Sequence, residues 1–171
     1  MATGLSTQLA KQVGEFLVAA ELGRMGLVAA TFAGNVPDYD IIATDLYGRS
    51  VPVQVKATRG KSWQFDIRKF ASVRLEGKTQ IVGSPVPDRV PGLVCVMVAL
   101  AGYGQDRFYV LPWQSLRELM VTRYGFYINK HGDGRPKRFD SFHSAITEAP
   151  LAPFKDAWLQ EFRDRAGLQL S

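Results

Sequence analysis

Residues 51–58 read Val-Pro-Val-Gln-Val-Lys-Ala-Thr, and this stretch decides the fold that we expect. Alternate side chains of a β-strand share one face of the sheet, so the three valines point one way while Gln54 and Lys56 point the other. The valine face is typical of a protein core. An amide and an ammonium side by side on the second face indicate a functional site.

The segment from residue 39 to residue 58 is predicted to form a β-hairpin that contains this strand. Its first half, Tyr39-Asp-Ile-Ile-Ala-Thr, is rich in strand-forming residues. The turn follows in Asp45-Leu-Tyr-Gly-Arg-Ser, where Gly48 can adopt a positive φ. We therefore expect two antiparallel strands joined by a short loop.

The loop length decides which side chains of the hairpin meet. A three-residue loop over 46–48 places Asp40 opposite Gln54, and a loop over 47–49 places it opposite Lys56. Both registers put the three even-numbered residues on one face. A two- or four-residue loop would point Asp40 away from the other two.

The length of 171 residues and the 46% hydrophobic composition predict one folded domain over residues 1–171. We expect a core over 5–112 and a helical C-terminal extension over 113–171. A helix, several strands and further helices are typical of an α/β or α+β domain with a central mixed sheet flanked by helices. The expected elements besides the hairpin are a helix over 5–25, strands over 27–33 and 63–68, an irregular loop over 82–92, a second hairpin from 93–100 and 107–111, and helices over 113–124 and 154–165.

The single cysteine and the short apolar runs indicate the cellular compartment. Cys95 lies within the apolar run of residues 93–100, where we expect a buried thiol, and one cysteine excludes an intramolecular disulfide. That run is far shorter than the roughly 20 residues needed to span a bilayer. The N-terminal residues lack the pattern of a signal peptide. We therefore expect a cytoplasmic protein that does not enter a membrane.

Positive charge is concentrated in two stretches of the chain. The net charge is +5, yet residues 56–78 alone carry a local charge of +5 and residues 121–143 carry +3, which leaves −3 for the remainder. Such concentration favours a polyanionic partner such as nucleic acid. The alternative is a generally basic surface that keeps the protein soluble.

Two carboxylates stand in places where a purely structural role is costly. Glu15 borders the apolar stripe of the first helix, where the alternative is a helix-edge carboxylate that reaches water or Lys11. Asp40 begins a strand that is otherwise apolar. Two carboxylates near an ammonium and an amide form an oxygen-rich site suited to Mg²⁺ or Mn²⁺. In such a site Lys56 would orient a nucleophile or stabilise developing negative charge.

The ordered set of these residues resembles the PD-(D/E)xK nuclease superfamily. Its parts here are Gly14-Glu15 on the helix, Pro37-Asp-Tyr-Asp40-Ile-Ile-Ala at the hairpin entry, and Gln54-Val-Lys56 on the strand. The arrangement is most similar to small Holliday-junction resolvases and to the Gln-x-Lys branch around Mrr-like restriction enzymes. The resemblance covers residues 14–58, with 63–68 fitting the next core strand and nothing specific beyond residue 70.

The resemblance implies a restriction-endonuclease-like fold and a metal-dependent DNA endonuclease that cleaves phosphodiester bonds in structured or branched DNA, as in repair or recombination. Glu15 and Asp40 would be metal ligands, with the backbone carbonyl of Val55 as a third. Gln54 would occupy the usual carboxylate position, also as a metal ligand, and Lys56 would be the catalytic lysine.

Gln54 is the departure from this pattern, because most members of the superfamily have Asp or Glu there. An amide still offers an oxygen to a metal but removes one negative charge. The alternative function is therefore a nucleic-acid-binding module on the same fold that has lost cleavage. An RNA substrate and a role in toxicity or defence also stay open.

Basic residues near the site and in the second stretch are candidates for contact with nucleic acid. They supply affinity and salt dependence. The aromatics Phe126, Tyr127 and Phe139 flank the second group and would either stack on bases or belong to the core. Cleavage of both strands would favour a homodimer with two-fold symmetry. The candidates are Arg59, Lys61, Arg68 and Lys69 in the first group, and Lys130, Arg135, Lys137 and Arg138 in the second.

Overall fold

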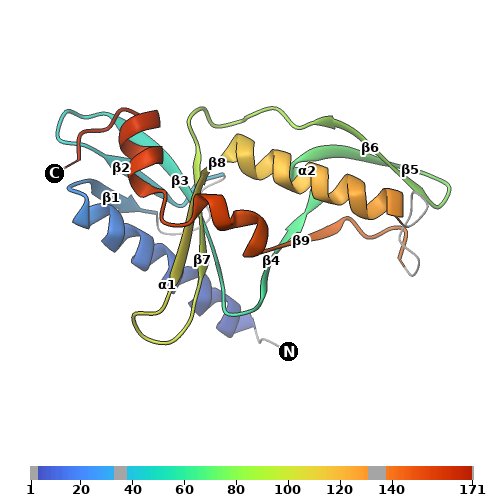
Figure 1. The fold of residues 1–171 in the computed structure, drawn as a ribbon, viewed down its shortest axis with the longest axis horizontal. Coiled ribbons are helices and arrows are strands. Elements are labelled where there is room, and N and C mark those ends of the chain that lie inside the picture. Colours follow the sequence, from blue (N-terminus) through green and yellow to red (C-terminus); the bar gives the residue numbers. More distant parts are fainter. Residues whose placement is uncertain (1–3, 33–37, 131–137, 171) are drawn as a thin grey trace.

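A mixed sheet runs through the middle of the computed structural model, which describes residues 4–32, 38–130 and 138–170. Its strands are β1 (Val28–Thr31), β2 (Ile41–Thr44), β3 (Ser50–Thr58), β7 (Val94–Ala99) and β8 (Arg107–Pro112). Their spatial order is β1-β2-β3-β7-β8 (Figure 1), with β3 and β7 parallel and the other neighbours antiparallel. The expected central mixed sheet is confirmed.

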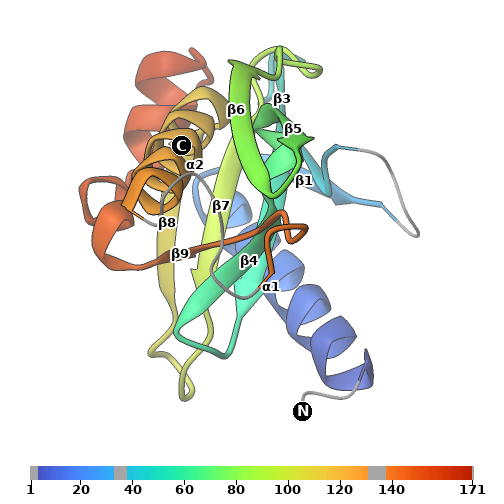
Figure 2. The same ribbon diagram turned by 90° about the vertical axis from the view of Figure 1, so that its right-hand side faces the viewer.

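Helices cover both faces of this sheet, with α1 (Gly4–Arg24) on one side and α2 (Trp113–Lys130) on the other, as Figure 2 shows. Strand β7 explains why two layers form, because all of its residues are buried. Its even-numbered valines pack with Val18 and Leu22 of α1. Cys95 and Met97 point the other way and pack with α2, so the predicted burial of the thiol is confirmed.

The hairpin of β2 and β3 has the first of the two predicted registers. Ile41 lies opposite Val53, and the backbone N–H of Asp45 donates to the carbonyl of Arg49 at 3.0 Å, which closes a loop over 46–48. Gly48 has a φ of 80°, which glycine adopts without steric cost. Asp40 is therefore opposite Gln54, as the even-numbered pattern requires.

The strand predicted over 63–68 does not continue the central sheet, so that part of the prediction is wrong. This strand, β4 (Ser62–Asp66), pairs with β9 (His143–Thr147) in a separate two-stranded sheet. The place beside β3 belongs to β7, which is apolar on both faces and can be buried between two layers. Strand β4 alternates buried Trp63 and Phe65 with polar residues and therefore suits a sheet with one wet face.

The middle of the chain contains a hairpin that the pattern did not predict. Strands β5 (Ala71–Glu76) and β6 (Thr79–Pro85) pair antiparallel beside α2 (Figure 1). The loop predicted over 82–92 therefore begins only at residue 86, because its first residues extend β6. Helix α2 starts where predicted and continues to Lys130, six residues past the expected end.

The C-terminal extension is not helical throughout, contrary to the prediction. It contains β9, and Pro150 and Pro153 shape the 3₁₀ helix η2 (Ala149–Phe154). The helix predicted over 154–165 starts later, and its main part is the π-helix η3 (Gln160–Arg165). Phe162 and Leu168 then enter the core beneath α1, so the end of the chain completes the N-terminal layer. No helix among the described residues is long and apolar enough to cross a membrane.

Candidate functional site

Asp40 lies directly before the first residue of β2, beside the part of β3 that extends past β2. Its carboxylate accepts a hydrogen bond from the Val55 N–H at 2.8 Å, and its own N–H donates to the Val53 carbonyl at 2.8 Å. Beyond the end of β2 the Val55 N–H has no ladder partner, so a side chain supplies the acceptor. The predicted register is correct, and the carboxylate reaches the backbone of β3 at Val55.

Helix α1 brings Glu15 to the same edge because the helix approaches β3 closely at Gly14. A Cβ atom on Gly14 would lie 2.4 Å from the Cβ of Ala57, so only glycine permits this distance. The ammonium of Lys11 lies 3.4 Å from a carboxylate oxygen of Glu15 and 3.3 Å from one of Asp40. Glu15 therefore reaches Lys11, which is the alternative that the sequence left open for this carboxylate. The same lysine also contacts Asp40.

The two carboxylates are held near each other at an electrostatic cost. Burial, followed by the charge of Asp40, raises the pKa of Glu15, although Lys11 opposes the shift. Partial burial opposes the charge of Lys11, yet Asp40 and Glu15 together raise its pKa. Oε1 of Glu15 is buried and has no hydrogen-bond partner among the described residues. Lys11 approaches this same oxygen at 3.4 Å, so the two carboxylates share one ammonium at this edge.

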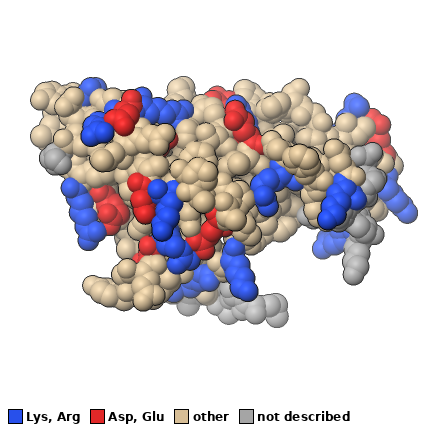
Figure 3. Space-filling model, in the orientation of Figure 1, with Lys and Arg blue, Asp and Glu red and all other residues tan. Residues whose placement is uncertain are grey.

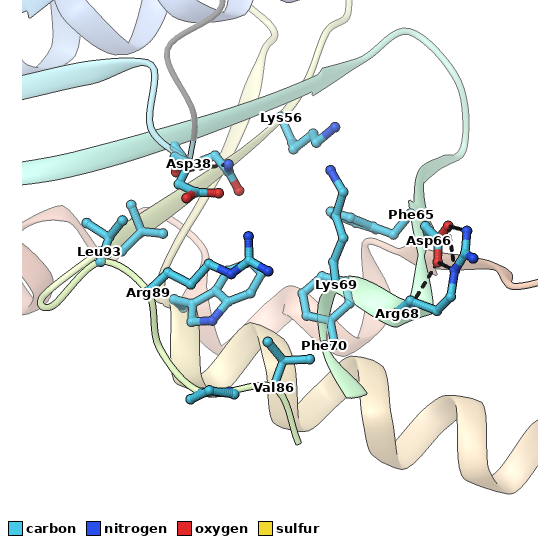
Figure 4. Close-up of a pocket in the computed structure, with 14 residues that line it drawn as sticks. Asp38, Lys56, Phe65, Asp66, Arg68, Lys69, Phe70, Val86, Arg89 and Leu93 are labelled. Atoms are coloured by element: carbon cyan, nitrogen blue, oxygen red, sulfur yellow. Dashed lines mark hydrogen bonds and ion pairs between the residues drawn. The ribbon is translucent and has the colours of Figure 1, made fainter. Parts of the chain in front are cut away.

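Gln54 and Lys56 stand on the other face of β3, as predicted. The Gln54 amide donates to the backbone carbonyl of Asp38 at 3.1 Å. Burial, followed by the nearby charge of Lys69, lowers the pKa of Lys56. Its ammonium lies 5.5 Å from the centre of the Phe65 ring, and Figure 4 shows the ends of the Lys56 and Lys69 side chains directed into the same space.

A pocket of about 330 Å³ opens beside Gln54 and Lys56. Its lining combines the aromatic side chains of Phe65, Phe70 and Trp113 with several cations, of which Lys56, Lys69 and Arg89 are labelled in Figure 4. Sequence reasoning missed Arg89 and Trp113 as site residues. Arg89 lies in a Pro- and Gly-rich loop without periodicity and Trp113 begins a helix, so no local signal connects either one to Lys56.

The first group of basic candidates is only partly available for an anionic ligand. Arg68 forms an ion pair with Asp66 at 2.5 Å and lies over the Phe142 ring at 4.5 Å. Lys69 lines the pocket beside Lys56. Arg59 and Lys61 are exposed in the turn between β3 and β4. The structure thus brings Lys69 to Lys56 and leaves Arg59 and Lys61 farther along the strand.

The second group lies at the far end of α2, about 25 Å from Trp113 by the rise of an α-helix. Lys130 and Arg138 are exposed there, whereas Arg135 and Lys137 lie outside the described residues. Lys and Arg side chains gather at this end of the molecule in Figure 3. The flanking aromatics are not core residues, since Phe126 is 73% exposed, Tyr127 38% and Phe139 37%.

The donor set at the sheet edge suits a hard cation that keeps several of its waters. Within the described parts of the chain, no three Asp, Glu, His or Cys side chains form a metal-binding group. Mg²⁺ is usually bound by one or two carboxylates together with water and substrate phosphate, so Glu15 and Asp40 meet that need. The Val55 N–H points at Asp40. The carbonyl of a strand residue points to the same edge of the strand as its N–H, so the Val55 carbonyl also faces the side of β3 where Asp40 lies.

Comparison with known proteins gives one structural likeness to report. No family model matches the sequence, and no curated protein matches it. Among solved structures the chain is similar to a bacterial homing endonuclease, I-Ssp6803I, with a TM-score of 0.49 and 16% sequence identity over 94% of this chain and 97% of that chain. Similarity at this level leaves the chemistry to be argued from the residues themselves.

Proposed function

We propose that this protein is a divalent-metal-dependent endonuclease that hydrolyses phosphodiester bonds of DNA. The observation that supports this best is the meeting of the Glu15 and Asp40 carboxylates beside the start of β2, where the ammonium of Lys11 bridges them. Lys56 extends from the same part of β3.

Each residue of the site has its own role in the proposed reaction. Glu15 and Asp40 would hold Mg²⁺ or Mn²⁺, aided by the Val55 carbonyl. Such an ion, when bound, supplies a Lewis acid and an activated water. Gln54 faces the pocket instead, where its amide donates to the Asp38 carbonyl. Lys56 is held by its strand in a half-buried place, where burial lowers its pKa. A positioned ammonium of this kind stabilises the negative charge that develops on a phosphoryl oxygen.

The positive charge around the site supports DNA as the binding partner. Lys69, Arg59 and Lys61 extend from the site along the chain as exposed cations, and such cations bind phosphates with little regard to sequence. The proposal includes structured or branched DNA as the substrate and a homodimer as the assembly.

A binding module without cleavage is the second candidate. Gln54 favours it, and so does the finding that no third carboxylate joins Glu15 and Asp40 in a metal-binding group among the described residues. In that case Lys11 would hold Glu15 and Asp40 together permanently and no metal would enter.

The test is cleavage of a DNA panel (duplex, nicked, flapped, single-stranded and four-way junction) with Mg²⁺ or Mn²⁺. We expect Lys56→Ala and Asp40→Ala each to lose on the order of 100-fold in rate, because the first removes the cation that stabilises developing charge and the second removes a ligand of the metal. Lys78→Ala is the matched control, since Lys78 is exposed in the turn between β5 and β6.

Binding measured on the same panel separates the two candidates. Salt-sensitive binding without cleavage by the wild type would overturn the nuclease and favour the binding module. Equal cleavage by the wild type and Lys56→Ala would overturn the role of the lysine.

A further inference from the structure

We propose that the pocket beside Lys56 receives one unpaired nucleobase of the DNA, next to the phosphate at the candidate site. This inference rests on the proposed function for its ligand class and adds the structural state of the substrate. It concerns a different face of β3 from the Glu15 and Asp40 edge. Its occupant is a flat aromatic group that carries a phosphate.

The floor of the pocket is aromatic. The rings of Phe70 and Trp113 are stacked with centroids 4.9 Å apart and planes 21° apart, and Phe65 meets Phe70 edge-on at 5.3 Å. Phe70 is fully buried whereas Trp113 is half-buried, so the aromatic cluster reaches the pocket surface at Trp113. Nucleobases stack on such platforms irrespective of sequence.

The rim of the pocket is cationic. Lys56, Lys69 and Arg89 line it and form no ion pair within the part of the chain that the structure describes. Arg68 is neutralised by Asp66. Asp38 adds one carboxylate to the lining, so the cations outnumber the acidic groups there. A positive rim around an aromatic floor suits a nucleotide, whose base is apolar on its faces and whose phosphates are negative.

The wall opposite β3 is held in place without a ligand. The Val86 N–H donates to the Phe70 carbonyl at 2.8 Å. The Arg117 guanidinium donates to the Val86 carbonyl and to the Asp88 carboxylate, both at 2.7 Å. The volume of about 330 Å³ falls in the range of roughly 300–1,000 Å³ that is usual for small-molecule pockets. The cavity is therefore preformed and large enough for a base.

Substrate choice follows from this geometry. A paired base is stacked between its neighbours and cannot reach a pocket, so binding to a duplex carries the free-energy cost of unpairing and unstacking one base. A bulge, a flap or a junction offers an unpaired base without that cost. The pocket thus predicts a preference for DNA with an unpaired nucleotide.

The experiment measures binding by fluorescence anisotropy in EDTA, so that cleavage plays no part. The probes are a labelled duplex, the same duplex with a single extrahelical nucleotide, and the mononucleotide dAMP as a competitor. We expect wild type to bind the bulged duplex on the order of tenfold more tightly than the paired one. Val86→Trp fills the pocket and should reduce this preference to below about twofold.

Two further variants make the result specific to the pocket. Val28→Trp adds the same ring at a site that is 62% exposed on β1, and it should keep the full preference. Arg89→Ala removes an exposed rim cation and should weaken binding of the bulged duplex more than of the paired one. Circular dichroism establishes that each variant is folded.

Each outcome decides the inference. Equal affinity of wild type for the two duplexes, or an unchanged preference in both Val86→Trp and Arg89→Ala, would overturn it while leaving metal-dependent cleavage intact. Effective competition by dAMP with no preference for the bulge would assign the pocket to free nucleotides and overturn it as well. A bulge preference in a protein that never cleaves would support the pocket and overturn the proposed nuclease.

Discussion

Gly14 is the residue at which α1 approaches β3 closely enough for Glu15 to meet Asp40. Replacement by alanine would put a Cβ 2.4 Å from that of Ala57, and both atoms belong to rigid backbone-attached groups. We expect Gly14→Ala to lower the free energy of unfolding by about 1–3 kcal/mol through overpacking. It should also reduce cleavage, because the helix must move away from Asp40. Urea denaturation and cleavage rates measure the two effects.

Gly23 provides the matched control on the same helix. A Cβ at Gly23 has no atom within 4 Å, so Gly23→Ala should raise the free energy of unfolding by about 0.5–1 kcal/mol through helix propensity. A Gly14→Ala variant as stable as wild type would contradict the close packing of α1 on β3.

The residue types of the site were predictable, whereas some of their contacts were not. The even-numbered spacing of Asp40, Gln54 and Lys56 predicted their shared register, which the hairpin has. The hydrogen bond of the Asp40 carboxylate to Val55 was not predictable, because it depends on β2 beginning one residue after Asp40. Lys11 entered the sequence argument only as an alternative partner of Glu15, and its second contact, to Asp40, needs the helix and the hairpin together.

At the scale of elements, β4 is tied to β3 through the indole of Trp63. Its Nε1 donates to the Lys56 carbonyl at 2.8 Å, and its ring is buried. Trp63→Phe keeps an aromatic ring but removes this hydrogen bond, which should cost about 0.5–1.5 kcal/mol of unfolding free energy. Because the carbonyl belongs to the candidate catalytic lysine, cleavage should slow as well.

Trp158 serves as the control for this change, since its ring packs against Phe108 and Phe162 and no hydrogen bond of its indole is found among the described residues. Chemical denaturation of Trp63→Phe and Trp158→Phe should show the larger loss in the first. Equal losses would mean that the indole hydrogen bond contributes nothing to stability.

The pairing partners of the strands could not be predicted from the sequence. Alternation identified β4 as a strand, yet its partner β9 lies some 80 residues later and has no separate signal in the sequence. The hairpin of β5 and β6 is mostly exposed, so it lacks the apolar alternation that reveals a half-buried strand. Both misses arise where tertiary contacts, and not local patterns, make the strand.

At the scale of the whole molecule, Asp45 joins the β2–β3 turn to the end of the chain. Its carboxylate accepts the N–H groups of Tyr47 and Arg49, both at 2.9 Å, and that of Gln169 at 3.0 Å. Desolvation opposes the charged form, but these hydrogen bonds, those of Gln169 and Arg49 foremost, lower the pKa of Asp45 to about 2 from an ordinary value of 3.8.

The sign of the pH dependence follows from this lowered pKa. The ionised Asp45 stabilises the fold above the ordinary value, and that contribution is lost as the pH falls from about 4 towards 2. Thermal unfolding of Asp45→Asn should therefore depend less on pH in this range than that of wild type. Glu76→Gln, at an exposed position on β5, is the control. Parallel curves for wild type and Asp45→Asn would refute the assignment.

The central hairpin and the face shared by its candidate residues follow from the sequence, because the two-residue period of a strand and the turn at Gly48 are local properties. The structure selected one of the two registers that the sequence allowed. The sequence also determined which residues could enter the buried centre, since β7 is apolar throughout. Only the tertiary structure decided that β7, and not β4, lies beside β3, and that Glu15 reaches Asp40 through Lys11. It alone placed Arg89 and Trp113 beside Lys56. These are contacts between distant segments, which form when layers pack and leave no periodic trace in the chain.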